Sequence, residues 1–160
     1  MSRPVDAQQE IHERFMAEAL AEARAAALRG EVPVGAVIVR EGQIIARAGN
    51  RREERGDPTA HAEIDALRAA AAALGGWYLH GCTLYVTLEP CPMCAGAILQ
   101  ARLAAVVFGA YDAKAGCCGS LYNLPEDARF PHRAAVTGGV LAAQCAAELS
   151  AFFKSRRGKA

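Results

Sequence analysis

The sequence contains no long apolar run and no targeting segment. No stretch of about eighteen apolar residues occurs, so we expect no transmembrane helix. Residues 1–6 lack the apolar core and the cleavage site of a secretory signal. A protein of a reducing compartment keeps cysteines as thiols or metal ligands, so we expect a soluble, cytoplasmic chain. The free thiols among its 6 cysteines are then Cys82, Cys117, Cys118 and Cys145.

Net charge is also nearly absent. The formal value of +1 neither favours nor excludes a nucleic-acid partner. The length of 160 residues fits one domain, with 52% hydrophobic and 22% charged residues as in ordinary globular proteins. Positive charge is concentrated at the C-terminus, where such a cluster by itself most often indicates a solvated face. The cluster consists of Lys154, Arg156, Arg157 and Lys159.

The chain has only one C-x-x-C motif, so a four-cysteine zinc ribbon has no second half. The motif is Cys91-Pro92-Met93-Cys94, and His61-Ala62-Glu63 precedes it. His61, Cys91 and Cys94 supply three zinc ligands, which leaves the fourth tetrahedral position open for water, as in catalytic sites. Glu63 lies two residues from His61 and off its helical face, which favours a proton carrier over a fourth ligand.

Other interpretations of the separate parts remain open. A lone histidine is more often a core or surface residue, and one C-x-x-C is also typical of a redox pair. Both motifs, however, are predicted at helix starts, where the helix dipole lowers thiol pKa values and favours thiolates. The joint H-x-E and P-C-x-x-C pattern, with a helix start at each half, favours a catalytic zinc site.

Helix and strand signals alternate along the chain, which predicts a layered α/β domain with crossover connections. Glu41-Gly42 reads as the turn of a hairpin. The segment from Asp112 to Phe130 has no period and reads as a functional loop. In the last helix, Leu141, Cys145, Leu149, Phe152 and Phe153 are expected on one face. We expect helices at about 8–29, 57–74, 92–101 and after 139, and strands at 32–39, 43–48, 82–88 and 104–109.

Several segments around these motifs resemble the cytidine deaminase superfamily, and within it the bacterial tRNA-specific adenosine deaminases. The resemblance covers about residues 10–157 of what we take as a single domain, 1–160. Its strongest parts are residues 31–37, 57–64 and 85–97. Weaker support follows at residues 107–114, 119–120, 139–141 and 150–153.

The resemblance implies a three-layer α/β/α fold with a central mixed sheet of about five strands, one Zn²⁺ per subunit and a homodimer. It implies hydrolytic deamination of adenosine to inosine at wobble position 34 of a tRNA anticodon. In this chemistry Glu63 takes a proton from water and gives one to the purine ring. The base, already unpaired in the anticodon loop, is splayed toward the metal.

The same resemblance assigns substrate contacts. Asn50 and the backbone N–H of Ala62 are expected to hold the base. Asp112 and Lys114 are expected to contact the nucleotides beside the target, with Asp112 accepting a hydrogen bond from a ribose 2′-OH. Arg156 is expected to contact phosphates. From their helical register, Phe152 and Phe153 are expected to be at least half in the core. The rest of their surface is available for contact with RNA.

Some positions depart from the family pattern. Pro131 precedes His132 where the family usually has Asn, which leaves the role of His132 open. Gln144 replaces an acidic residue, and Cys117-Cys118 replace small ones.

Two other functions remain. One is deamination of a small substrate such as guanine or cytidine. The other is a non-catalytic, zinc-stabilised RNA-binding module, against which the carboxylate of Glu63 argues.

Overall fold

The computed structural model describes residues 4–157, with side chains from residue 7 onward. Lys159, which belongs to the basic C-terminal cluster of the sequence, lies outside the described residues. None of the helices within residues 4–157 is both long and apolar enough to span a bilayer. The elements, in chain order, are α1 (Pro4–Leu28), β1 (Gly35–Arg40), β2 (Gln43–Gly49), α2 (Arg52–Arg55), α3 (Ala62–Leu74), β3 (Cys82–Leu88), α4 (Pro92–Gln100), β4 (Ala105–Ala110), β5 (Ala135–Thr137) and α5 (Ala142–Arg157).

The strands form one mixed sheet in the order β2-β1-β3-β4-β5. β1 pairs antiparallel with β2 and with β3, whereas β3–β4 and β4–β5 are parallel. The β1–β2 pairing confirms the predicted hairpin with its turn at Glu41-Gly42. The parallel β3–β4 pair requires a crossover, which α4 provides on one face of the sheet.

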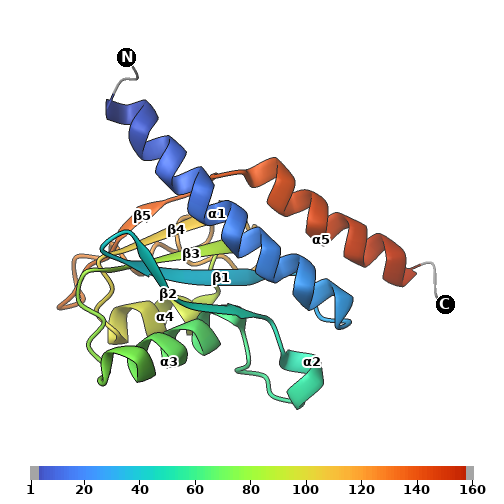
Figure 1. Cartoon of the computed structure of the whole chain (residues 1–160), viewed down its shortest axis with the longest axis horizontal. Helices are drawn as coiled ribbons and strands as arrows, with labels where there is room; N and C mark the ends of the chain where they lie inside the picture. The colour runs from blue at the N-terminus through green and yellow to red at the C-terminus, as the bar shows by residue number, and fades with distance from the viewer. Residues whose placement is uncertain (1–3, 158–160) are drawn as a thin grey trace.

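Helices cover both faces of the sheet, so the predicted three-layer architecture is confirmed (Figure 1). α1 and α5 lie on one face, and α3 and α4 lie on the other. Side chains of each strand alternate between these layers, because successive residues of a strand point to opposite faces. In β1, Val37 and Val39 pack toward Phe15 and Met16 of α1, while Ile38 packs into the α3–α4 core.

The start of α3 differs from the prediction. The sequence predicts a helix from Asp57, but α3 begins at Ala62. The Asp57 carboxylate instead accepts hydrogen bonds from the backbone N–H of Thr59 at 2.8 Å and from its hydroxyl at 2.7 Å. This Asx-type turn holds residues 57–60 outside the helix and leaves His61 as the N-cap.

The segment between β4 and β5 is largely irregular, as predicted for residues 112–130. It contains an isolated bridge between Cys118 and Asn123. The ring Nε2 of His132 donates to the carbonyl of Leu103 at 2.7 Å, which fastens the end of this segment beside β4. His132 therefore has a structural partner, and Pro131 next to it does not prevent this bond.

The predicted apolar face of α5 is only partly correct. Cys145 is buried, and Phe152 is half-buried, but Phe153 is 48% exposed. The two phenylalanine rings point in different directions because adjacent residues of a helix are about 100° apart. Leu141 precedes the helix, with a φ of 52°.

Candidate metal and active site

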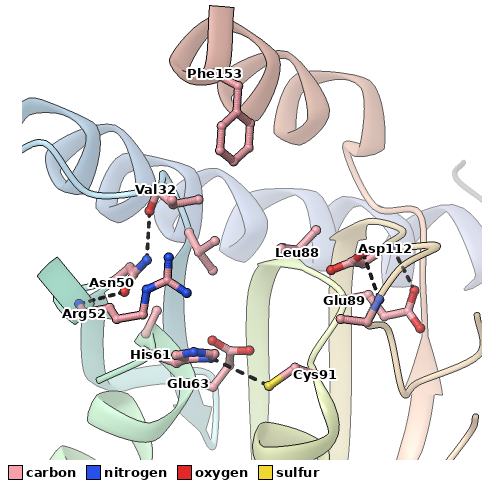
Figure 2. Close-up of a pocket in the computed structure, with 13 residues that line it drawn as sticks. Val32, Asn50, Arg52, His61, Glu63, Leu88, Glu89, Cys91, Asp112 and Phe153 are labelled. Carbon is pink, nitrogen blue, oxygen red and sulfur yellow. Dashed lines mark hydrogen bonds between the residues drawn. The ribbon is translucent and has the colours of Figure 1, made fainter. Parts of the chain in front are cut away.

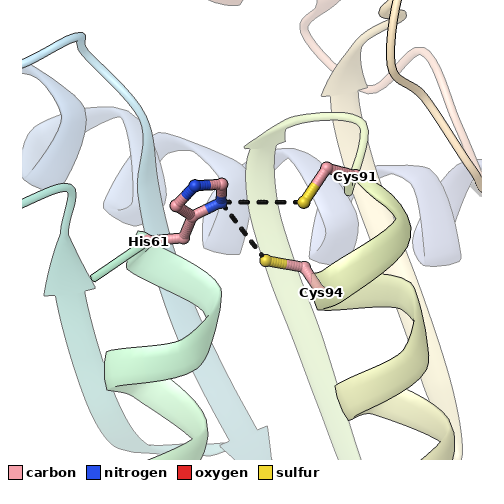
Figure 3. Close-up of side chains that lie close together, drawn as sticks. All are labelled: His61, Cys91 and Cys94. Atoms are coloured by element: carbon pink, nitrogen blue, oxygen red, sulfur yellow. Dashed lines mark hydrogen bonds between the residues drawn. The ribbon is translucent and has the colours of Figure 1, made fainter. Parts of the chain in front are cut away.

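Three side chains from two helix starts converge on one point, as Figure 3 shows. The Nδ1 atom of His61 lies 3.7 Å from the Sγ atom of Cys91 and 3.5 Å from that of Cys94. All three ligand atoms lie within 4.8 Å of one another. The structure thus brings together the three residues that the sequence singles out as metal ligands.

These separations fit a tetrahedral zinc ion. With Zn–N bonds of about 2.05 Å and Zn–S bonds of about 2.3 Å, the N···S edge of a tetrahedron is about 3.6 Å long. The observed values of 3.5 and 3.7 Å agree with this edge. The donor set of one imidazole and two thiols is also one that zinc prefers. The residues therefore form a zinc site with three protein ligands, His61, Cys91 and Cys94.

Local chain geometry places the ligands. His61 is the N-cap of α3, with φ −79° and ψ 152°, and Cys91 is the N-cap of α4, with φ −74° and ψ 176°. Pro92 follows in the first helical turn, where its missing N–H costs nothing. Cys94 lies three residues after Cys91, so both thiols face the same side of that turn.

The two thiols differ in their acidity. Hydrogen bonding from the Cys94 thiol lowers the pKa of Cys91 to about 4, and the bond to His61 acts in the same direction. The shared hydrogen bond and burial raise the pKa of Cys94. Of the two thiols, Cys91 gives up its proton more readily, and zinc binding requires both as thiolates.

Glu63 adds a buried carboxyl beside the ligands (Figure 2). Its side chain belongs to the first turn of α3 and is only 4% exposed. Burial raises the pKa of the Glu63 carboxyl, because the charged form loses its hydration. A carboxyl with a raised pKa accepts and returns a proton more readily at neutral pH than an ordinary one. The arrangement is thus suited to proton transfer at the open vertex.

His61, Cys91 and Glu63 form the floor of a cavity of about 260 Å³, drawn in Figure 2. This volume is of the order of one nucleoside. Its walls come from the segment before β1, the residue after β2, the starts of α2 and α3, the end of β3 with the residues after it, the loop after β4, and α5. The lining residues are Val32, Val34, Asn50, Arg52, His61, Ala62, Glu63, Leu88, Glu89, Cys91, Asp112, Ala115 and Phe153.

Four of the predicted substrate contacts line this cavity: Asn50, Ala62, Asp112 and Phe153. The Asn50 side chain is fixed, since its Oδ1 accepts from the Arg52 N–H at 3.0 Å and its Nδ2 donates to the Val32 carbonyl at 3.4 Å. Figure 2 shows the Phe153 ring pointing down from α5 toward the ligands.

The other three predicted contacts lie outside the cavity. Lys114 and Arg156 line a neighbouring hollow that also contains Phe153. The Arg156 guanidinium lies 4.7 Å from the centre of the Phe152 ring and donates to the Gly30 carbonyl. Arg156 therefore ties α5 to the end of α1 in addition to facing this hollow.

Sequence reasoning missed three residues around the cavity: Glu31, Arg52 and Glu89. Glu31 and Glu89 are buried carboxylates, 1% and 2% exposed, that accept hydrogen bonds from distant backbone N–H groups. The donors to both carboxylates lie more than twenty residues away along the chain, so no local pattern marked them. Arg52 carried no signal that distinguished it from Arg51 and Arg55.

Comparison with known proteins identifies the family. Residues 9–110 match the family model "Cytidine and deoxycytidylate deaminase zinc-binding region". The chain is 54% identical to the tRNA-specific adenosine deaminase of Bacillus subtilis (strain 168) over 147 residues, which is 92% of this chain and 91% of the relative. It is 48% identical to the enzyme of that name from Haemophilus influenzae over 149 residues, covering 92% and 86% of the two chains.

Solved structures agree. A structure from a study of A-to-I editing by tRNA:A34 deaminases superposes with a TM-score of 0.81 at 47% identity, covering 85% of this chain and 99% of the other. The guanine deaminase of Bacillus subtilis matches with a TM-score of 0.60 at 46% identity, but covers only 62% of this chain and 64% of its own. The protein thus belongs to the zinc-dependent cytidine and deoxycytidylate deaminase family and, within it, to the tRNA-specific adenosine deaminases.

Proposed function

We propose that this protein hydrolyses adenosine to inosine at wobble position 34 of a tRNA anticodon. The observation that carries the proposal is the buried carboxylate of Glu63 beside a three-ligand zinc site at the floor of a nucleoside-sized cavity. The relatives named tRNA-specific adenosine deaminase support the choice of substrate, because they match this chain over about nine tenths of its length.

The chemistry follows from the positions of these groups. Zinc in this ligand set supplies Lewis-acid activation of a water molecule. Glu63 accepts a proton from that water as its oxygen forms a bond to C6 of the purine. Glu63 then gives that proton to the ring nitrogen. The proton of the new C6 hydroxyl passes to the amino group, and the bond from C6 to this nitrogen breaks, which releases ammonia and leaves the C6 carbonyl of inosine. Adenosine and water are thus converted to inosine and ammonia.

Substrate contacts are assigned to the cavity walls. Asn50 retains one amide N–H and further acceptor capacity for the base, because two hydrogen bonds already fix its orientation. The backbone N–H of Ala62 lies at the start of α3, where helix N–H groups have no helical acceptor. Asp112 receives the ribose, and Phe153 offers a ring for stacking against a nucleotide.

The outer RNA contacts lie around the hollow next to the cavity. Lys114, Arg156 and Arg157 surround it, and Phe153 separates it from the cavity. Cationic side chains supply most of the sequence-independent affinity for a phosphate backbone. We assign Phe152 to holding Arg156 in place, since the guanidinium lies over its ring.

We also propose that the chain assembles as a homodimer in the cytoplasm. An apolar groove between α3 and α4 supports the homodimer: Leu67, Ala71, Leu79 and Ala97 line it, and Trp77 at its edge is 66% exposed. Four thiols outside the zinc site, those of Cys82, Cys117, Cys118 and Cys145, form no disulfide, which fits a reducing compartment. Sedimentation at micromolar concentration is expected to give twice the chain mass, and Trp77→Ser is expected to shift it toward the monomer. A monomer for the parent protein contradicts the homodimer.

The substrate proposal is tested with purified protein and three kinds of substrate. An anticodon stem-loop with adenosine at position 34 is incubated in parallel with free adenosine, guanine and cytidine. Inosine in the stem-loop, with little turnover of the free compounds, is the expected result. Turnover of guanine or cytidine alone favours the small-substrate alternative, to which the match with the guanine deaminase of Bacillus subtilis gives weight.

A further inference from the structure

Glu89 is a buried carboxylate that the chemistry above does not use. It follows β3 directly, is 2% exposed and lies at the wall of the cavity, two residues before Cys91. No Lys or Arg among the described residues forms an ion pair with it. A charged group in such a position persists only when hydrogen bonds replace its hydration.

All its hydrogen-bond donors come from the loop after β4. The backbone N–H groups of Asp112 and Cys118 each lie 3.0 Å from a Glu89 carboxylate oxygen, and that of Ser120 lies at 2.9 Å. The Ser120 hydroxyl also donates to this carboxylate. Figure 2 shows Glu89 and Asp112 side by side at one wall of the cavity.

These bonds act together with a few backbone bonds, such as the one from the Cys117 N–H to the Pro90 carbonyl at 2.8 Å, to hold a loop with little regular structure. Residues 112–120 contain turns but no helix or strand. Gly116 packs directly on the carboxylate, since a Cβ atom there would lie 2.3 Å from the Glu89 Cδ. One carboxylate thus organises backbone groups from Asp112 to Ser120 by direct contact.

The carboxylate of Asp112 is oriented as a consequence. Its Oδ1 accepts from the N–H of Lys114 at 3.0 Å and from that of Ala115 at 3.2 Å, while Glu89 holds its own N–H. Within the described residues these bonds use Oδ1, which leaves acceptor capacity on Asp112 for a ligand in the cavity.

We propose that Glu89 is a positioning residue for substrate discrimination: it holds the loop so that Asp112 faces the ribose of a nucleotide beside the target. Glu89 thereby sets the preference for ribose over 2′-deoxyribose at that nucleotide without itself touching the sugar. This proposal rests on the function proposed above.

The chain offers a matched control in a second buried carboxylate, which holds another segment next to the site. Glu31 is also a buried carboxylate, 1% exposed, and accepts from the N–H groups of Glu53 at 2.9 Å and Glu54 at 2.7 Å. It holds α2 and with it the segment of Asn50, which is assigned to the base rather than to the sugar. A change at Glu31 therefore disturbs the site without moving the ribose contact.

The experiment compares Glu89→Gln, Glu31→Gln and the parent protein in zinc-loaded form. Each acts on two stem-loops that keep adenosine at the target position and carry either ribose or 2′-deoxyribose at the nucleotides directly beside it. We expect the parent to prefer ribose by about 10- to 100-fold in kcat/KM, the range for a hydrogen bond to a charged group. In Glu89→Gln most of this ratio is expected to disappear, because kcat/KM falls more for the ribose substrate than for the deoxyribose substrate. Glu31→Gln is expected to lower kcat/KM for both stem-loops, while the ratio between them stays within about twofold of the parent's.

Two further variants keep the test decisive if Glu89→Gln folds poorly. Ser120→Ala removes one donor from the carboxylate and is expected to lower the ratio partially. Asp112→Ala is expected to bring the ratio close to one. Adding Ser120→Ala to that variant is expected to leave the ratio unchanged, because both residues act through the same contact.

An unchanged ratio in both Glu89→Gln and Ser120→Ala overturns the positioning role, as does a parent ratio near one. These outcomes leave the proposed function intact as long as the parent forms inosine in the ribose stem-loop. Failure of the parent to do so overturns the function itself and the inference with it.

Discussion

Glu63→Gln is expected to lower the rate of deamination by about 10⁴-fold while zinc remains bound. General acid–base catalysis contributes about 10²- to 10⁴-fold, and the upper end applies because one carboxylate transfers both protons. The variant keeps its fold, since an uncharged amide is easier to bury than a carboxylate, and Glu63 is only 4% exposed. Single-turnover rates, zinc content and melting temperature measure the three parts of this result.

Asp65→Asn is the matched control, on the same helix and two residues further on. The Asp65 carboxylate pairs with Arg55 at 2.9 Å and does not line the cavity, so its replacement is expected to change the rate by less than about twofold. Turnover by Glu63→Gln within tenfold of the parent rate refutes the proton-transfer role. A parent protein that binds stem-loop RNA without any turnover instead points to the non-catalytic, zinc-stabilised binding module.

Cys94→Ser is expected to abolish zinc binding and activity together. Cys94 is fully buried and forms one corner of the ligand triangle. A serine hydroxyl in its place is a much weaker zinc ligand than a thiolate. Loss of the metal also lowers stability, because free energy of metal binding is part of the free energy of folding at such a site. Elemental analysis is expected to fall from about one zinc per chain to nearly none, and the melting temperature is expected to fall with it.

Cys82→Ser separates ligation from burial. Cys82 is equally buried, but its thiol faces the carbonyl of His80 at 3.7 Å and lies outside the ligand triangle. This variant is expected to lose some stability and to keep its zinc and its activity. Full zinc occupancy in Cys94→Ser excludes the proposed ligand set, and so does metal loss from both variants.

The metal site was predictable because its signal is local. His61 and the Cys91–Cys94 pair each belong to a short motif, and Pro92 marks the start of α4 in the sequence. The start of α3 was predicted five residues too early, but the motif still placed His61 next to that helix. The alternation of helices and strands was predictable for a similar reason, since each element has its own apolar period. The three-layer order followed from the resemblance to the family.

What the sequence did not predict depends on contacts between distant segments. The donors to Glu89 lie 23 to 31 residues away, and those to Glu31 lie 22 and 23 residues away, so neither carboxylate has a local signal of its role. The four-residue helix α2 is too short to have a period. The late start of α3 reflects the turn at Asp57, where a side chain competes with the helix for backbone N–H groups.

Hydrolysis in heavy-oxygen water tests the central claim most directly. An anticodon stem-loop is incubated with the zinc-loaded protein in that solvent and then digested to nucleosides for mass spectrometry. The account predicts inosine with a heavy oxygen at C6, formed only from the adenosine at position 34 and only when Glu63 is present. Unaltered adenosine, or inosine with ordinary oxygen, contradicts it.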